Sequence, residues 1–262
     1  MSELSVFKTK YDLICPIGEW CGPSLWMRKL GLRSCSLPLD WVGLAPMKVF
    51  VDQICGDFAN FMRAENLKLL KESDDPEFGL NEYIDTATTL QSHHDFPYGV
   101  PFEKAYPVVA ARFARRIARL YERVGTAHRT LFVHFARQRP ASREIVLDCA
   151  ARLRGKFPGR DLDLLVIEND MTLDAEIRDE LSPGVVYIRG PFFPKGCDIR
   201  YGDRRLCGRI FGALRLRGRL RNLLNRKLGR LIFQLKTNCH LTSAGRKAAR
   251  SKDRRMNFRG DN

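Results

Sequence analysis

An alternation of strand-like and helix-like segments between residues 108 and 190 constrains the fold more than any other feature of this sequence. Apolar runs of strand length alternate there with amphipathic segments of helical period. The expected strands cover 131–135, 162–169 and 185–190, and the expected helices cover 108–124, 142–156 and 173–181. Because this order favours parallel strands joined by crossover helices, we predict an α/β fold with a mixed or parallel sheet and flanking helices.

The first hundred residues predict a further strand, two further helices and two irregular segments. An apolar run over 11–17 ends in proline and glycine, which indicates a buried strand entering a turn. Pro23 after this turn and Gly31 after the next apolar stretch predict a helix over about 22–30. The remaining patterns predict a helix over 46–63, a loop over 71–82 and an ordered loop or strand-turn segment over 93–107.

Basic residues are concentrated toward the C-terminal end of the chain. The formal net charge is +15. Residues 204–262 contain 18 Lys and Arg against 2 acidic residues, whereas residues 1–203 contain 27 basic against 28 acidic residues. We therefore expect an α/β domain over 1–203, a basic amphipathic helical segment over 204–236 and a disordered basic tail over 237–262.

The basic segment 204–236 has leucines at helical spacing with arginines beside them. The stripe consists of Leu220, Leu224, Leu228, Leu231 and Leu235. Such a pattern is typical of a helix that lies on an anionic membrane, although a core-packed helix with an arginine-rich outer face fits equally well. Nucleic-acid binding is less favoured, because the segment offers only Phe211 and Phe233 for stacking on bases.

Eight cysteines raise the question of a disulfide framework. The chain is much longer than the small secreted domains that depend on one. Residues 1–11 are polar, unlike a signal peptide, and no uncharged apolar run reaches the length of about 18 residues that a membrane helix needs. We therefore expect free thiols and a cytoplasmic location, with the inner membrane as a peripheral contact through 204–236.

Cys21 is the candidate nucleophile, because it lies between a turn and the start of a predicted helix. Backbone N–H groups and the dipole at a helix N-terminus stabilise a thiolate and can hold a developing oxyanion. A small buried cysteine that only packs is the structural alternative. His94 is the candidate base and His93 the alternative base, since a neutral imidazole accepts a thiol proton near pH 7. Surface histidines in a turn are the structural alternative for both.

At this point the segment from Ile17 to Gly43 resembles the N-terminal motif of a family of papain-like cysteine peptidases from bacteria. The positions in register are Gly18, Cys21, Leu30, Gly31, Leu32, Arg33, Pro38, Asp40 and Trp41, and Leu39 replaces a phenylalanine of the family pattern. Further blocks of the pattern match His94-Asp95-Phe96, Arg115-Arg116-Ile117 and the strand over 131–135. The resemblance covers about residues 11 to 170.

The resemblance implies a papain-like catalytic domain over 1–203 with the nucleophile before the base in the chain. It implies that Cys21 attacks an amide or ester bond of a peptide or acyl substrate and that His94 is the base. The candidates for a third catalytic residue are Asp40, Asp95, Asn169 and Asp170. Asp40 and Asp170 rank together, since Asp170 follows a predicted strand where α/β sites gather, whereas Asp40 fits a structural Asx turn equally well.

Motifs for metals and nucleotides are missing from the sequence. It contains no Cys-x-x-Cys, no His-Glu-x-x-His and no glycine-rich phosphate loop, so we expect no metal and no cofactor. The alternative function is that of a membrane-associated transferase or sugar-nucleotide-binding protein of bacterial surface-polysaccharide assembly, in which Cys21 is dispensable.

Overall fold

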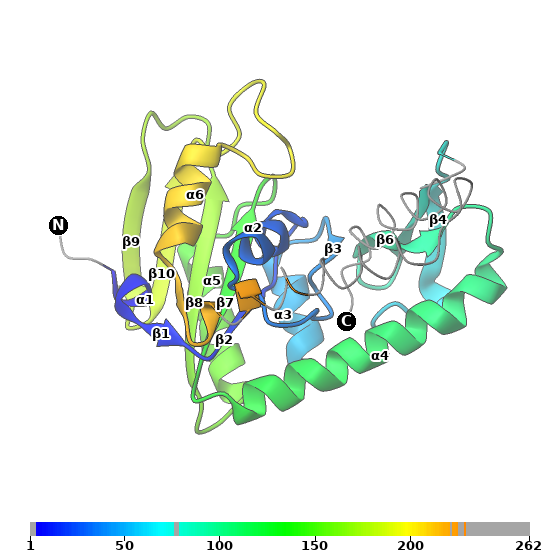
Figure 1. Cartoon of the computed structure of the whole chain (residues 1–262), viewed down its shortest axis with the longest axis horizontal. Helices are drawn as coiled ribbons and strands as arrows, with labels where there is room; N and C mark the ends of the chain where they lie inside the picture. The colour runs from blue at the N-terminus through cyan, green and yellow to red at the C-terminus, as the bar shows by residue number, and fades with distance from the viewer. Residues whose placement is uncertain (1–3, 76–78, 221, 225–227, 229–262) are drawn as a thin grey trace.

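The computed structural model describes residues 4–75, 79–220, 222–224 and 228 of the chain (Figure 1). The strands of its central sheet are β2 (Leu13–Pro16), β7 (Arg129–Ala136), β8 (Asp161–Asn169), β10 (Val185–Gly190) and β9 (Ile177–Ser182), in that spatial order. The first four are parallel, and β9 is antiparallel to β10. The predicted α/β class with a mixed sheet and flanking helices is thereby confirmed.

A second, antiparallel sheet lies at the other end of the molecule. It contains β3 (Val42–Gly43), β6 (Gln91–Pro97), β5 (Leu80–Asp85) and β4 (Leu67–Lys71), in that spatial order, and a 3-10 turn at Ala64–Asn66 precedes β4. Helix α4 (Phe102–Thr126) runs from this sheet to the central sheet (Figure 1). The segment over 93–107 therefore contains most of β6 and the start of α4.

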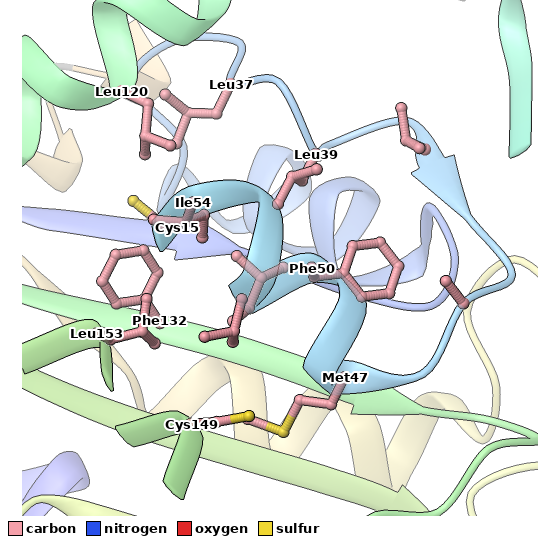
Figure 2. Close-up of a cluster of buried hydrophobic side chains, with 14 of the residues drawn as sticks. Cys15, Leu37, Leu39, Met47, Phe50, Ile54, Leu120, Phe132, Cys149 and Leu153 are labelled. Atoms are coloured by element: carbon pink, nitrogen blue, oxygen red, sulfur yellow. The ribbon is translucent and has the colours of Figure 1, made fainter. Parts of the chain in front are cut away.

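Helices cover both faces of the central sheet. One face carries α1 (Ser5–Lys8), α2 (Gly22–Leu30) and α6 (Arg204–Ala213), and the other carries α3 (Met47–Cys55), α4 and α5 (Arg143–Lys156). Strand residues alternate between the two faces, so Phe132 packs in one hydrophobic cluster and Val133 in the other. Figure 2 shows the first cluster, in which Phe50 and Ile54 of α3 lie near Phe132 of β7.

Helix α2 matches its predicted limits because its ends have strong local signals. Pro23 lies in the first turn, and Gly31 ends the helix in the left-handed conformation with φ 71°. A side chain at Gly31 would also collide with Leu223, whose Cγ lies 2.5 Å from the position of a Cβ. The helix buries Trp26, which stacks on Phe211 of α6 at a ring-centroid distance of 6.0 Å.

Two predicted helices are wrong in extent or in type. The helix expected over 46–63 ends at Cys55, and Asp57, Phe58 and Met62 then adopt left-handed backbone conformations. The spacing misled because Phe58 and Met62 still face the core without being helical. The helix expected over 173–181 is replaced by the edge strand β9, which turns into β10 through Gly184 with φ 74°.

The described part of the basic segment 204–236 consists of several short elements. Helix α6 ends at Ala213, and the strand β11 (Arg215–Leu216) follows and pairs with β1 (Lys10–Tyr11). Because α6 buries Cys207, Ile210 and Phe211 in the same core as the central sheet, it is a core-packed helix with a basic outer face. Helical residues resume at 219–220, 222–224 and 228, whereas Leu231, Leu235 and the tail over 237–262 lie outside the described residues.

Candidate active site

Cys21 lies where strand β2 leads into helix α2. It is the N-cap residue of α2 and is partly exposed, and its carbonyl oxygen accepts a hydrogen bond from Leu25 N at 3.0 Å. Cys21 therefore stands at the carboxyl edge of the parallel strands, where the loops after β7, β8 and β10 also emerge. In sheets of this type, loops at this edge are the usual position of ligand-binding and catalytic groups.

The buried carboxylate of Glu19 holds the loop in front of Cys21. It accepts hydrogen bonds from the backbone N–H groups of Arg137, Gln138 and Arg139 at 2.7, 3.0 and 3.2 Å. The Arg139 guanidinium adds an ion pair at 2.8 Å. Glu19 thus joins the loop after β2 to the loop after β7. Our sequence reasoning missed it, although an acid inside the segment Ile-Gly-Glu-Trp-Cys was a visible signal.

Trp20 covers the first turn of α2. A Cβ at Gly22 would lie 2.2 Å from the Trp20 ring, so this approach requires glycine. The Trp20 ring meets Phe193 edge-on at a centroid distance of 4.9 Å. The Arg137 guanidinium lies over the same Phe193 ring, 5.1 Å from its centroid. Two aromatic rings, Trp20 and Phe193, and the Arg137 guanidinium therefore lie together beside the start of α2.

The protonation of Cys21 depends on burial and on nearby arginines. Burial raises the pKa of the Cys21 thiol, whereas its own backbone N–H and the charges of Arg200, Arg137 and Arg28 act to lower that pKa. Burial outweighs the other effects, so the pKa lies above its ordinary value and sulfur keeps its proton near pH 7. Burial thus opposes the thiolate that the helix N-terminus was expected to stabilise, and the degree of burial was not visible in the sequence.

His94 lies on β6, in the second sheet. Its ring meets the edge of Trp41 at a centroid distance of 5.6 Å. Burial lowers the pKa of His94 to about 4, with a further lowering by His93, while Asp95 and Glu82 act in the opposite direction. The imidazole is therefore neutral near pH 7, as a proton acceptor must be.

Two residues, Arg28 and Trp41, connect the surroundings of Cys21 with those of His94. The Arg28 guanidinium, which acts on the Cys21 thiol, also lies over the Trp41 ring at 5.9 Å, and Trp41 contacts His94. Strand β3 links the two regions as well, because Leu44 N donates to Glu19 O at 2.7 Å and Val42 pairs with Ser92 of β6. The pairing of Cys21 with His94 as nucleophile and base stays a prediction.

The candidate third residues in the matched motifs make contacts of a structural kind. The Asp40 carboxylate forms a buried ion pair with Arg33 at 2.6 Å and accepts a hydrogen bond from Leu37 N at 3.0 Å. The Asp95 carboxylate accepts hydrogen bonds from Ser92 at 2.9 Å and Arg112 at 3.1 Å. Each carboxylate thus closes a local turn or anchors a helix.

The remaining candidate residues, His93, Asn169 and Asp170, also make local contacts. His93 Nδ1 lies 3.1 Å from a Glu82 carboxylate oxygen, on β5. Asn169 accepts a hydrogen bond from Phe193 N at 2.9 Å, and Asp170 accepts hydrogen bonds from the backbone and hydroxyl of Thr172 at 3.0 and 2.6 Å. These two hydrogen bonds lower the pKa of Asp170. Asp170 therefore lies at the same sheet edge as Cys21, engaged in its own turn.

Arg137 and Arg200 are site residues that sequence reasoning did not single out. Arg137 directly follows β7, and Arg200 lies in the loop after β10, where Asp198 binds it at 3.1 and 3.2 Å. The only available signal was their position after predicted strands, which many arginines share. Among the described residues no group of three or more His, Cys, Asp or Glu side chains could hold a metal, and the seven described cysteines are free. No helix in the described part is long and apolar enough to cross a bilayer.

Comparison with known proteins places these observations in a family. A family model with the description "Putative papain-like cysteine peptidase" matches residues 12–171, a range that includes Cys21, His94 and Asp170. The "Uncharacterized protein R408" of Acanthamoeba polyphaga mimivirus is 27% identical over 134 residues, which cover 46% of this chain and 60% of that protein. Since this relative is viral, the restriction of the resemblance to bacteria is not confirmed. No solved structure matches the chain. With more than half of its residues matched by the family model, the chain belongs to the family with the description "Putative papain-like cysteine peptidase".

Proposed function

We propose that the protein is a cysteine hydrolase in which Cys21 is the nucleophile and His94 the base, and that it cleaves an amide or ester bond. The observation that carries this proposal is the position of Cys21, a partly exposed thiol at the N-terminus of α2 and at the carboxyl edge of the central sheet. Membership of the family supports the same reaction class. Of the other described cysteines, Cys15, Cys149 and Cys207 are buried.

The proposed reaction begins from a neutral pair. The Cys21 thiol gives its proton to the neutral His94 imidazole as sulfur adds to the substrate carbonyl carbon. The backbone N–H groups of Gly22 and Ser24, in the first turn of α2, stabilise the resulting oxyanion in this scheme. The carbon–nitrogen or carbon–oxygen bond then breaks, and the leaving group takes the proton from the imidazolium. Water, deprotonated by His94, hydrolyses the remaining thioester and restores the thiol.

Substrate binding has to assist the proton transfer from Cys21 to His94 in this scheme. The raised pKa of Cys21 and the lowered pKa of His94 disfavour proton transfer before the substrate arrives. The arginines near the thiol reduce this penalty once a thiolate forms. They also favour a substrate with negative charge close to the bond that is cleaved, because unlike charges attract in a site partly shielded from water.

The first test is hydrolysis of a panel of fluorogenic peptide amides and aryl esters by the full chain. Cys21→Ser and His94→Gln should each lower kcat/KM by roughly a hundredfold or more, the size expected for loss of a nucleophile or a general base. Cys55→Ser and His128→Gln are the matched controls, since Cys55 ends α3 and the His128 side chain is 81% exposed. Both controls should retain activity.

Trapping decides between the functional alternatives. Intact-mass spectrometry after brief reaction with an aryl ester should find one acyl group on Cys21. Full activity of Cys21→Ser, or acylation at another cysteine, would overturn the proposal. Loss of activity in His93→Gln together with a normal His94→Gln would transfer the role of base to His93. Sugar-nucleotide binding that is unaffected by Cys21→Ser would favour the transferase alternative instead.

A further inference from the structure

The chain after β11 is held against the C-terminal end of α2. Arg219 Nε donates a hydrogen bond to Leu30 O at 2.8 Å, and Asn222 Nδ2 donates to Gly31 O at 3.2 Å. Leu223 packs beside Gly31, where there is no room for a side chain. These three contacts determine which side of the helical residues around 219–224 faces the protein.

The opposite side carries a row of exposed leucines. Leu220, Leu224 and Leu228 are 75%, 65% and 56% exposed. A spacing of four residues places successive side chains on one side of a helix. Contiguous apolar surface on a protein that is otherwise well packed marks a contact surface for a partner or a membrane. We call these three residues the leucine row.

The charge around the leucine row restricts the kind of partner. Arg215 and Arg217 precede it in the chain and are exposed, with Arg217 paired to Asp12 at 2.9 Å, and the sequence over 204–262 contains 18 Lys and Arg against 2 acidic residues. An acidic surface therefore complements the charge of this part of the sequence. Nucleic acid would satisfy the charges but not the leucines, because bases bind by stacking on aromatic rings. A bilayer with anionic lipids satisfies both, through its acyl chains and its headgroups.

We propose that the leucine row docks this protein onto the surface of an anionic lipid bilayer, with the basic excess of 204–262 supplying the electrostatic attraction. The contacts of Arg219 and Asn222 then hold the C-terminal end of α2 close to the bilayer. Cys21 stands at the other end of this nine-residue helix, about 13 Å away at the usual rise per residue. Docking would therefore leave the thiol outside the lipid and close to its surface.

Vesicle sedimentation of the full chain tests the proposal. The protein should pellet with mixed phosphatidylserine–phosphatidylcholine vesicles, stay in solution with pure phosphatidylcholine vesicles, and be released by high salt. The variant Leu220→Ser/Leu224→Ser/Leu228→Ser should bind the anionic vesicles at least about tenfold more weakly, since each leucine loses apolar burial in the bilayer. Leu69→Ser/Leu70→Ser, which changes two leucines that are 51% and 50% exposed on β4, is the control and should bind as the wild type does.

Three outcomes would overturn the proposal. The first is unchanged vesicle binding by the leucine-row variant. The second is the absence of vesicle binding together with tight, salt-sensitive binding of single-stranded RNA, which would assign the basic region to nucleic acid. The third is a dimer in lipid-free solution that the leucine-row variant dissociates, measured by light scattering, which would make the row an interface between copies. Circular dichroism spectra of the variants confirm that they are folded.

Discussion

At the scale of single residues, the chemistry of Cys21 reflects opposing influences on one sulfur atom. Burial favours the neutral thiol, and the guanidinium groups of Arg28, Arg137 and Arg200 favour the thiolate. The net pKa is raised, so the thiolate is scarce at neutral pH and increases as the pH rises through that value. A reagent that reacts only with the thiolate reports this balance directly.

Alkylation of Cys21 should therefore depend on both pH and reagent charge. The rate should rise with pH beyond the ordinary thiol value of about 8.5. The measured quantity is the ratio of the rate with negatively charged iodoacetate to the rate with neutral iodoacetamide. This ratio should be higher at Cys21 than at Cys55, because the arginines near Cys21 attract the anion. Arg137→Gln should reduce that ratio about two- to tenfold at low salt, as followed by mass spectrometry of labelled peptides. An equal ratio at both cysteines would mean that the arginines do not act on incoming reagents.

Asp40 should contribute to stability rather than to the reaction. Its carboxylate and the Arg33 guanidinium form a buried ion pair, and removal of one partner leaves an uncompensated charge. Asp40→Asn should lower the free energy of unfolding by about 3 to 5 kcal/mol in urea titrations. Asp170→Asn should cost less than about 1 kcal/mol, since Asp170 serves an exposed turn. A stable but inactive Asp40→Asn variant would instead place this residue in catalysis.

At the scale of elements, the loop between β2 and α2 depends on groups from two neighbouring elements. The Glu19 carboxylate accepts hydrogen bonds from three backbone N–H groups in the loop after β7. The Glu19 carbonyl oxygen accepts a further hydrogen bond from Leu44 N, beside β3. A Cβ at Gly43 would lie 2.5 Å from Glu19 O, so the close approach of β3 requires glycine. Cys21 is therefore positioned by contacts that lie far from it in the sequence.

Glu19→Gln should loosen this loop. The substitution removes the charge that Arg139 pairs with and one set of acceptor lone pairs, so we expect a loss of about 2 to 4 kcal/mol in the free energy of unfolding. Cys21 should also become more accessible, with faster alkylation at a given pH. Glu144→Gln, at an exposed position of α5, is the matched control and should change neither quantity. Unchanged stability of Glu19→Gln would show that the loop is held by packing alone.

At the scale of the whole molecule, the half-buried His94 and the buried His134 make stability depend on pH. Burial lowers the pKa of His94 to about 4, and burial also lowers the pKa of His134, whose Nδ1 lies 2.6 Å from Ile17 O. An unfolded histidine has a pKa of about 6.5. Between pH 4 and pH 6.5 the unfolded chain binds a proton that the folded protein does not. The free energy of unfolding is therefore highest above pH 6.5 and falls as the pH decreases toward 4.

His94 should account for about 3 kcal/mol of this loss in the free energy of unfolding. This magnitude follows from the difference between its unfolded pKa of about 6.5 and its folded pKa of about 4. Denaturant titrations between pH 7 and pH 4 should therefore show a steeper decline for the wild type than for His94→Gln. His128→Gln, with its exposed side chain, should decline like the wild type. Parallel curves for wild type and His94→Gln would mean that His94 is as accessible to protons in the folded protein as in the unfolded chain.

Local sequence was sufficient for the elements with strong end signals and continuous patterns. Helix α2 has its proline and glycine, and strand β8 contains the continuous apolar run 164–167, so both occur where they were predicted. Apolar spacing failed at 56–63 and at 173–181, because burial follows from neighbours and not from helical hydrogen bonds. The edge strand β9 is partly exposed and pairs on one side, which leaves little trace in its pattern.

The α/β class, the placement of Cys21 between a turn and a helix, and the charge asymmetry could all be predicted from the order of residues, since they depend on residues close together along the chain. The tertiary structure alone decided the surroundings of the thiol. Arg137 and Arg200 reach that region from two separate loops, and the degree of burial that raises the pKa of Cys21 arises only when the chain packs around it. Electrostatic and burial effects depend on distances through space, which the order of residues does not specify.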